Sequence, residues 1–129
     1  MKNQGIVWSL WEIFGYYFNT EIVEDYNHRQ ETDSKTFHLN LQSKNNRLKQ
    51  PMKFEIKDLE EGGIWLCKQS NEELIWLGDL YLYKENNKNE SYCFQDKGRF
   101  NYHGIEKALC GKGNYEEFTP KRIIAIQMK

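Results

Sequence analysis

The sequence lacks an excess of charge of either sign. Its 129 residues include 18 lysines and arginines against 19 aspartates and glutamates, for a formal net charge of −1. Nucleic-acid-binding domains usually show a clear basic excess, so this balance gives no support for a nucleic-acid partner. The sequence also has no apolar run of the roughly 20 residues that a membrane-spanning helix needs. We therefore expect neither a nucleic-acid partner nor a membrane span.

The sequence has few cysteines and no C-x-x-C pair. The three cysteines are Cys67, Cys93 and Cys110, an odd number at scattered positions. The opening stretch MKNQGIVWSLWEIFGYYF is interrupted by Glu12 and Gly15 and has no small-residue cleavage site. Disulfides are rare in reducing compartments. These features predict a cytoplasmic protein with free thiols, in which Cys67 and Cys93 are small buried residues.

No helical periodicity is sustained along the chain, and its length suits one domain. Aromatic residues make up 15% of the sequence, which favours strands. Alternating segments separated by polar turns predict eight or nine short strands. The main segments, of which 73–85 holds two strands, are residues 13–23, 36–43, 52–57, 64–69, 73–85, 90–95 and 121–128. The fold class we expect is mainly β, an antiparallel two-sheet β-sandwich with one or two short helices.

Alternation also predicts which side chains of these segments point into the core. In 36–43 the inward residues would be Phe37, Leu39 and Leu41. The polar residues between them would face solvent: Thr36, His38 and Asn40. The inward residues of the next segment would be Met52, Phe54 and Ile56. The two segments would then form a hairpin with one solvated face.

Three further local features are predicted. Gly78 and Asp79 break the long segment 73–85 into two strands, and Gly15 marks a bulge. In the second strand Leu80 and Leu82 face one way, and Tyr81 and Tyr83 the other. Residues 105–118 hold a helical turn that ends at Gly111. The apolar stretch 123–128 predicts a buried central strand, so that trimming it should be costly.

The chemistry-bearing residues form no recognisable constellation. His103 lies between Cys93 and Cys110 in the sequence, which is the minimum for a Cys–His nucleophile, but buried free cysteines are usually inert. The histidines and cysteines do not have the compact spacing of a zinc site. We therefore assign no catalytic, cofactor-binding or metal-ligating residue, and expect a protein that is not an enzyme.

The tryptophans offer a second interpretation. They are Trp8, Trp11, Trp65 and Trp76, and with the eight tyrosines they could form a stacking platform for sugars. Each lies in an apolar, strand-like run, so core packing is the interpretation we favour. A carbohydrate- or ligand-binding β-sandwich remains the alternative, and it predicts a row of exposed rings on one flat face.

The order of these segments resembles the TLDc domain, in a divergent, protist-like branch. The similar stretches are FGYYFNTEI, TFHLNLQSKNNRLKQPMKFEIK, LGDLYLYKENNKNESYCF, FNYHGIEKALCGKG and FTPKRIIAIQMK. They cover residues 13–129, the TLDc-like β-sandwich domain. Residues 1–12 form an N-terminal segment that does not match the family, whose own N-terminal part has no counterpart here. The glycine-rich stretch of better-known members is replaced by GDLYLYKE.

The resemblance implies a non-catalytic protein-interaction or regulatory domain. TLDc proteins are linked to oxidative-stress resistance and to binding of the vacuolar-type proton ATPase, so a subunit of that pump is the expected protein partner. Candidate surfaces are the outward-facing residues of the core strands and the loops near His38, 44–50 and 86–89, among which the sequence does not choose. The same oxidative-stress link leaves a thiol-based redox enzyme as a third interpretation.

Overall fold

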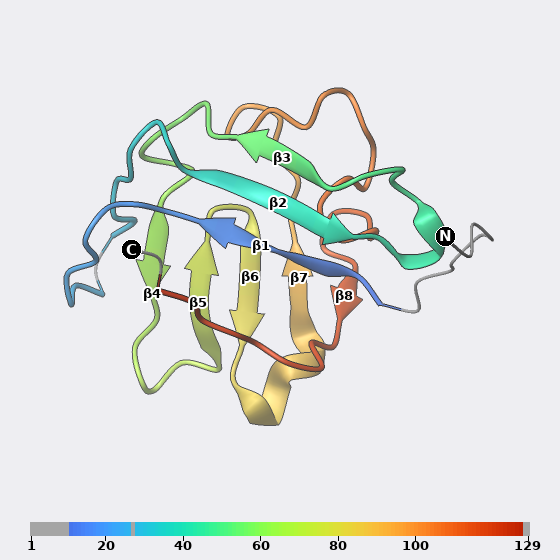
Figure 1. The fold of residues 1–129 in the computed structure, drawn as a ribbon. Coiled ribbons are helices and arrows are strands. Elements are labelled where there is room, and N and C mark those ends of the chain that lie inside the picture. The colour runs from blue at the N-terminus through green and yellow to red at the C-terminus, as the bar shows by residue number, and fades with distance from the viewer. Residues whose placement is uncertain (1–10, 27, 128–129) are drawn as a thin grey trace.

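The computed structural model describes residues 11–26 and 28–127, and in this part of the chain it is built mainly of strands (Figure 1). The strands are β1 (Ile13–Tyr17), β2 (Phe37–Gln42), β3 (Met52–Glu55), β4 (Ile64–Leu66), β5 (Glu73–Leu77), β6 (Leu80–Tyr83), β7 (Ser91–Cys93) and β8 (Glu117–Phe118). Two short 3₁₀ segments accompany them, η1 (Lys44–Asn46) and η2 (Glu85–Glu90). The predicted fold class, mainly β with two antiparallel sheets and few helices, is confirmed.

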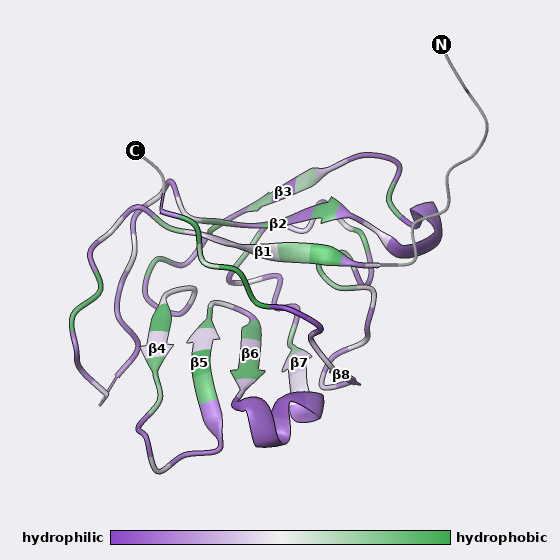
Figure 2. Ribbon diagram, turned by 60° about the horizontal axis from the view of Figure 1, so that its bottom comes forward, coloured by the Kyte–Doolittle hydropathy of each residue, from purple (hydrophilic) through white to green (hydrophobic). Residues whose placement is uncertain are grey.

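The strands form one sheet of three and one of five. The first has the order β1-β2-β3 and the second the order β4-β5-β6-β7-β8, and each paired strand is antiparallel to its neighbour. Within each sheet, strands that are consecutive in sequence are therefore neighbours in space. A short turn joins β5 to β6, whereas the long segments 18–36 and 94–116 join β1 to β2 and β7 to β8. Figures 1 and 2 show the three-stranded sheet lying across one end of the five-stranded sheet, with the core between them.

The core takes large side chains from both sheets and from the loops that follow β7. Phe54 on β3 and Leu80 on β6 are almost wholly buried, as are Phe100 and Leu109 in the loops. The predicted inward set of Met52, Phe54 and Ile56 is confirmed, since all three belong to or pack against this cluster. Leu80 and Leu82 also face it, as alternation predicts.

The inward face of β2 is the opposite of the predicted one. His38 and Asn40 are buried, with exposed fractions of 0% and 1%, whereas Leu41 is 53% exposed. The hairpin register explains this difference. His38 lies directly opposite Phe54 in the ladder, and opposed residues of an antiparallel pair share a face. Because Phe54 fills the core, His38 must point inward too. For Phe37, Leu39 and Leu41 to point inward, β2 would have to pair with β3 in a register shifted by one residue.

The turn between β5 and β6 confirms the predicted break at Gly78 and Asp79. Gly78 has a φ of +59°, which residues with a Cβ rarely adopt. An added Cβ would also lie 2.7 Å from both His38 Nε2 and Phe100 Cζ. The glycine therefore allows this turn to press against the three-stranded sheet.

The predicted central strand at 121–128 is wrong for the residues that the structure describes. Residues 119–127 have no strand pairing, and Ile123, Ile124 and Ile126 are 54%, 67% and 76% exposed. Pro120 has no N–H to give to a ladder directly after β8, which favours this early end. Figure 1 shows the segment as a red trace running from β8 back towards β4. Met128 lies outside the described residues.

Three smaller predictions also differ from the structure. The first strand ends at Tyr17 rather than at residue 23, and its register irregularity lies between Ile13 and Phe14 rather than at Gly15. Residues 105–118 contain a turn and not a helix, although Gly111 closes that turn with a φ of +79° and an N–H bonded to the Lys107 carbonyl.

Candidate binding groove on the five-stranded sheet

A row of aromatic side chains crosses the outer face of the five-stranded sheet. Trp65 on β4 lies opposite Trp76 on β5, Trp76 lies opposite Tyr81 on β6, and Tyr81 lies opposite Tyr92 on β7. Leu80 and Leu82 point into the core, so the residues that alternate with them point outward. Directly opposed residues therefore place four rings side by side on one face.

The rings of this row contact one another closely. Centroid distances are 5.0 Å for Trp65–Trp76, 5.2 Å for Trp76–Tyr81 and 4.8 Å for Tyr81–Tyr92. Tyr115 continues the row beside Tyr92, at 5.4 Å. The Tyr81 and Tyr92 rings are stacked at 14°, so each covers a face of the other. The rings thus stand against each other as packed aromatic pairs rather than lying flat on the sheet.

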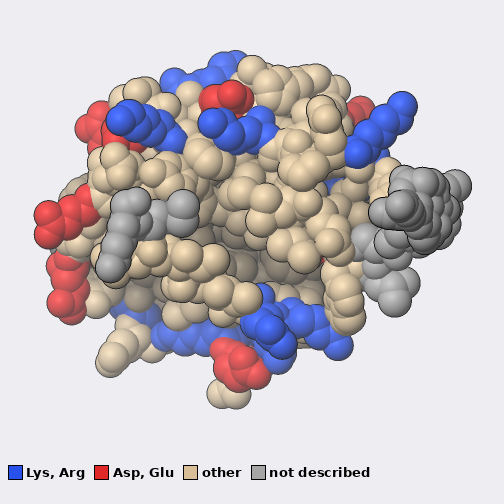
Figure 3. All heavy atoms as spheres, in the orientation of Figure 1, with Lys and Arg blue, Asp and Glu red and all other residues tan. Residues whose placement is uncertain are grey.

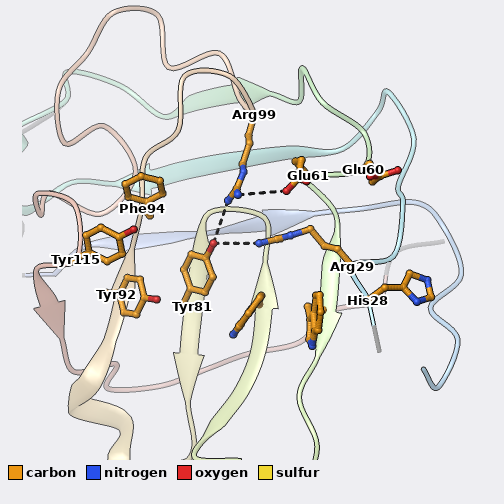
Figure 4. A pocket seen from close by; sticks show the side chains of 11 residues that line it. His28, Arg29, Glu60, Glu61, Tyr81, Tyr92, Phe94, Arg99 and Tyr115 are labelled. Atoms are coloured by element: carbon orange, nitrogen blue, oxygen red, sulfur yellow. Dashed lines mark hydrogen bonds and ion pairs between the residues drawn. The ribbon is translucent and has the colours of Figure 1, made fainter. Parts of the chain in front are cut away.

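A cavity of about 600 Å³ lies over this row (Figure 4). We call it the aromatic groove. Its lining residues are His28, Arg29, Glu60, Glu61, Trp65, Trp76, Tyr81, Tyr92, Phe94, Arg99 and Tyr115. The aromatic rings line one part of the groove and the charged side chains line another, so the groove combines apolar surface with polar groups. Pockets that bind ligands commonly have this composition.

Two arginines meet at the hydroxyl of Tyr81. Arg29 Nη2 donates to the Tyr81 oxygen over 3.2 Å, and Arg99 Nη1 donates to the same oxygen over 3.1 Å. Figure 4 shows the two guanidinium groups reaching this oxygen from different segments of the chain. The hydroxyl and the two guanidinium groups form what we call the head of the groove.

Arg29 is held in place by the backbone of the five-stranded sheet. Its Nη1 donates to the carbonyls of Gly63 and Gly78, over 2.9 and 3.0 Å. The guanidinium carbon also lies 5.6 Å from the centroid of Trp76, within the range of a cation–π contact. Gln30 fixes the preceding segment, because it exchanges backbone hydrogen bonds with Ile64 at the start of β4.

Arg99 is surrounded by carboxylates. Its nitrogens lie 3.5 Å from oxygens of Asp79, Asp96 and Glu61. Asp79 is fully buried and accepts hydrogen bonds from the Tyr102 hydroxyl and the Asp96 backbone N–H, over 2.6 and 2.8 Å. Burial raises the pKa of Asp79 to about 6, and the hydrogen bonds and Arg99 counteract that rise.

Asp79 and His38 connect the groove to the three-stranded sheet. The Asp79 backbone N–H donates to His38 Nε2 over 3.0 Å, so Nε2 carries no proton and the neutral ring is protonated at Nδ1. Nδ1 then donates to the Gly15 carbonyl on β1, over 3.1 Å. Burial lowers the pKa of His38 to about 3. His38 is therefore an internal bridge between the sheets. The sequence had suggested instead an exposed loop surface near His38.

The tryptophans differ in their positions. Trp65 and Trp76 are half-buried on the outer face, so the favoured placement in the core is wrong for both. Trp11 is 53% exposed and lies under Lys121 Nζ, at 5.6 Å from its centroid. Trp8 lies outside the described residues. The predicted row of rings exists on one face, but most of its members are only partly exposed.

The cysteines are all buried thiols in the structure. Burial raises the pKa of Cys67 to about 11 and raises that of Cys93. The Cys93 thiol hydrogen-bonds to Cys110, which lowers the pKa of Cys110. His103 does not serve as their base, since its Nε2 lies against the Lys53 carbonyl at 3.0 Å. Among the described residues, no cluster of three or more His, Cys, Asp or Glu could hold a metal ion.

The opposite side of the molecule has a different character. It carries the 119–127 segment (Figure 1), and its basic side chains lie mainly along two margins (Figure 3).

Within the described residues, no helix has the length and apolar character required to cross a lipid bilayer.

Comparison with known proteins gives no relative for this chain. No family model matches the sequence, and neither curated proteins nor solved structures give a match. The resemblance to the TLDc domain therefore stays a prediction. The aromatic groove has to be interpreted from its own geometry.

Part of the groove could have been found from the sequence. Tyr81 was expected to face the opposite way from Leu80 and Leu82, and the same alternation applied to Trp65 and Trp76 would have placed them beside it. Arg29 lies in a polar loop and Arg99 in a turn, and neither position has a distinguishing pattern. Long-range pairing brings them together, and no local signal in the sequence indicates that pairing.

Proposed function

We propose that this protein is a non-catalytic, cytoplasmic interaction module that binds a partner protein through the aromatic groove. The observation that carries the proposal is the composition of the groove, in which tryptophan, tyrosine and arginine side chains surround one cavity. These three residue types dominate the binding energy of protein interfaces. The rings are already ordered by mutual contacts, so they would lose little conformational entropy when a partner binds.

The resemblance to the TLDc domain supplies a candidate partner. It implies a subunit of the vacuolar-type proton ATPase, and a regulatory role in oxidative-stress resistance. A binding module needs neither a catalytic constellation nor a metal centre, and the groove offers apolar and charged contact surface instead.

Binding of the purified proton ATPase to the immobilised protein tests this function. Trp76→Ala should weaken binding at least about thirtyfold, because a central interface aromatic is worth about 2 kcal/mol or more. Trp11→Ala is the matched control, since it removes the same side chain from an exposed position outside the groove. Circular dichroism melting establishes that both variants are folded. Equal losses for the two variants, or no binding by the unmodified protein, would count against the proposal.

A carbohydrate-binding function is the second candidate, and the row of rings on one sheet face favours it. The geometry supports it less well, because a sugar stacks on an open ring face and the Tyr81 and Tyr92 faces cover each other. Intrinsic tryptophan fluorescence titrated with a glycan panel separates the two candidates. A saturable change with one glycan, lost in Trp76→Ala, would favour the sugar. An unchanged spectrum across the panel would end this candidate.

A further inference from the structure

We propose that the head of the groove is a carboxylate-binding subsite, which takes an aspartate or glutamate side chain of the partner. The inference rests on the proposed function and identifies the chemical group of the partner that binds at the head. Two features support it: the unused hydrogen-bond donors of Tyr81 and Arg29, and the balance of charge around them.

The Tyr81 hydroxyl has a proton to give. Its oxygen accepts from Arg29 and from Arg99, which uses both of its lone pairs. No hydrogen bond among the described residues uses the O–H of Tyr81 as donor. The residue is 8% exposed and lines the cavity, so its hydroxyl is available from the groove. An acceptor arriving in the groove would give this O–H a protein partner.

Arg29 adds an uncompensated positive charge. Its contacts are with two backbone carbonyls and the Tyr81 oxygen, and no described carboxylate lies within 4.0 Å of its guanidinium. A guanidinium has five N–H donors, and these three contacts use three of them. The remaining donors suit a planar carboxylate, which arginine binds with two parallel hydrogen bonds.

Arg99 contributes less charge, because Asp79 and Asp96 flank it. Its third carboxylate, Glu61, is 3.5 Å away and has a 55% exposed side chain, so solvent weakens that pair. An incoming carboxylate can therefore take the place of Glu61 at Arg99 while also reaching Arg29. Glu60 and Glu61 line the same cavity and would oppose a second negative charge. This arrangement favours one carboxylate rather than a polyanion.

The aromatic row beside the head defines what accompanies the carboxylate. Trp76 lies next to Arg29, and Tyr92 lies next to Tyr81. A partner segment with an acidic residue beside an apolar or aromatic side chain would place the acid at the head and the apolar group along the rings. A matched pair of small probes reproduces this combination: 3-phenylpropionate and its neutral amide, 3-phenylpropionamide.

Nuclear magnetic resonance titration of the isotope-labelled full chain tests the subsite. We expect 3-phenylpropionate to shift the Arg29 Nε–H and Trp76 indole N–H signals saturably. We expect it to bind about tenfold more tightly than the amide, as charged hydrogen bonds would give. Tyr81→Phe should reduce this preference, because it removes the hydroxyl donor and keeps the ring and both arginines. Tyr83→Phe, the matched control on the same strand and outside the lining of the groove, should retain it.

Three results would overturn the subsite: equal affinity for the acid and the amide, no saturable shift with either, or an unchanged preference in Tyr81→Phe. The first of these leaves the proposed function standing, because the indole signal would still report apolar binding in the groove. The proposed function itself is decided separately, by the Trp76→Ala and Trp11→Ala pair. Arg29→Lys gives a second check, since it keeps the charge and loses the paired donors, and it should reduce the preference for the acid.

Discussion

At the scale of single residues, the core of this protein depends on two buried ionisable groups. His38 is neutral and links β1 to the backbone of Asp79, and the Asp79 carboxyl holds Tyr102 and the segment at Asp96. Both groups are fully buried, so each carries a penalty when it becomes charged. The two penalties have opposite dependence on pH, because one group is a base and the other is an acid.

The His38 contribution to stability should be lost in acid. Its pKa is about 3 in the folded protein and about 6.5 when unfolded, so the contribution is fully present above pH 6.5 and is lost as pH falls towards 3. Relative to His38→Gln, the unmodified protein should lose about 3 kcal/mol between pH 7 and pH 4.5. Urea unfolding at several pH values measures this difference.

Two further residues affect that measurement. Asp79 titrates in the opposite direction to His38, and the exposed His28 provides the control variant. The raised pKa of Asp79, about 6, gives stability that is present below pH 4 and lost as pH rises through 6. It partly hides the His38 loss in the unmodified protein, which is why the comparison is made against a variant. His28→Gln, whose side chain is 62% exposed, should keep the acid slope. A difference in stability between His38→Gln and the unmodified protein that does not change with pH would contradict a lowered pKa at His38.

At the scale of elements, the β5–β6 turn positions both the groove and the core. Gly78 accepts a hydrogen bond from Arg29 at its carbonyl, and Asp79 follows it directly. The turn also approaches His38 and Phe100 so closely that a methyl group has no room. One turn therefore joins the head of the groove to the contact between the sheets.

Replacement of Gly78 by alanine should be more costly than replacement of Gly104. Both glycines have a positive φ, +59° and +74°, so both variants bear the same kind of backbone strain, about 1 kcal/mol. Only at Gly78 does the new Cβ meet other atoms, since nothing lies within 4 Å of it at Gly104. We expect Gly78→Ala to lose about 1–3 kcal/mol more in the free energy of unfolding. Equal losses in chemical denaturation would show that the turn can move away.

The elements themselves were largely predictable from the sequence, and their faces and pairings were not. Alternation found the hairpin of β2 and β3 and the break at Gly78, because both follow from local patterns. It placed His38 in solvent, because the rule assigns polar residues outward and the register is fixed by a partner strand. The apolar residues near 123–126 read as a strand, yet they find no partner within the described residues. Pairing is a long-range property that a local pattern does not contain.

At the scale of the whole molecule, the two sheets present different surfaces. The five-stranded sheet turns its aromatic row outward, and Arg29 and Arg99 reach that row from loops. The outer face of the three-stranded sheet carries Phe37, stacked on Tyr17 at 4.9 Å, and the exposed Leu41. Contiguous aromatic surface with polar groups at its edge is typical of sites that bind other molecules. Half-buried tyrosines and tryptophans can give up their remaining exposure to a partner at low entropic cost.

Site-specific photo-crosslinking tests most directly that the aromatic groove is the face that binds. A benzophenone amino acid replaces Tyr92 in the groove or Leu41 on the other sheet, and each protein is irradiated with the purified proton ATPase. We predict a crosslinked product from position 92, suppressed by excess unlabelled protein, and none from position 41. A product from position 41 alone, or from neither position, would contradict this prediction.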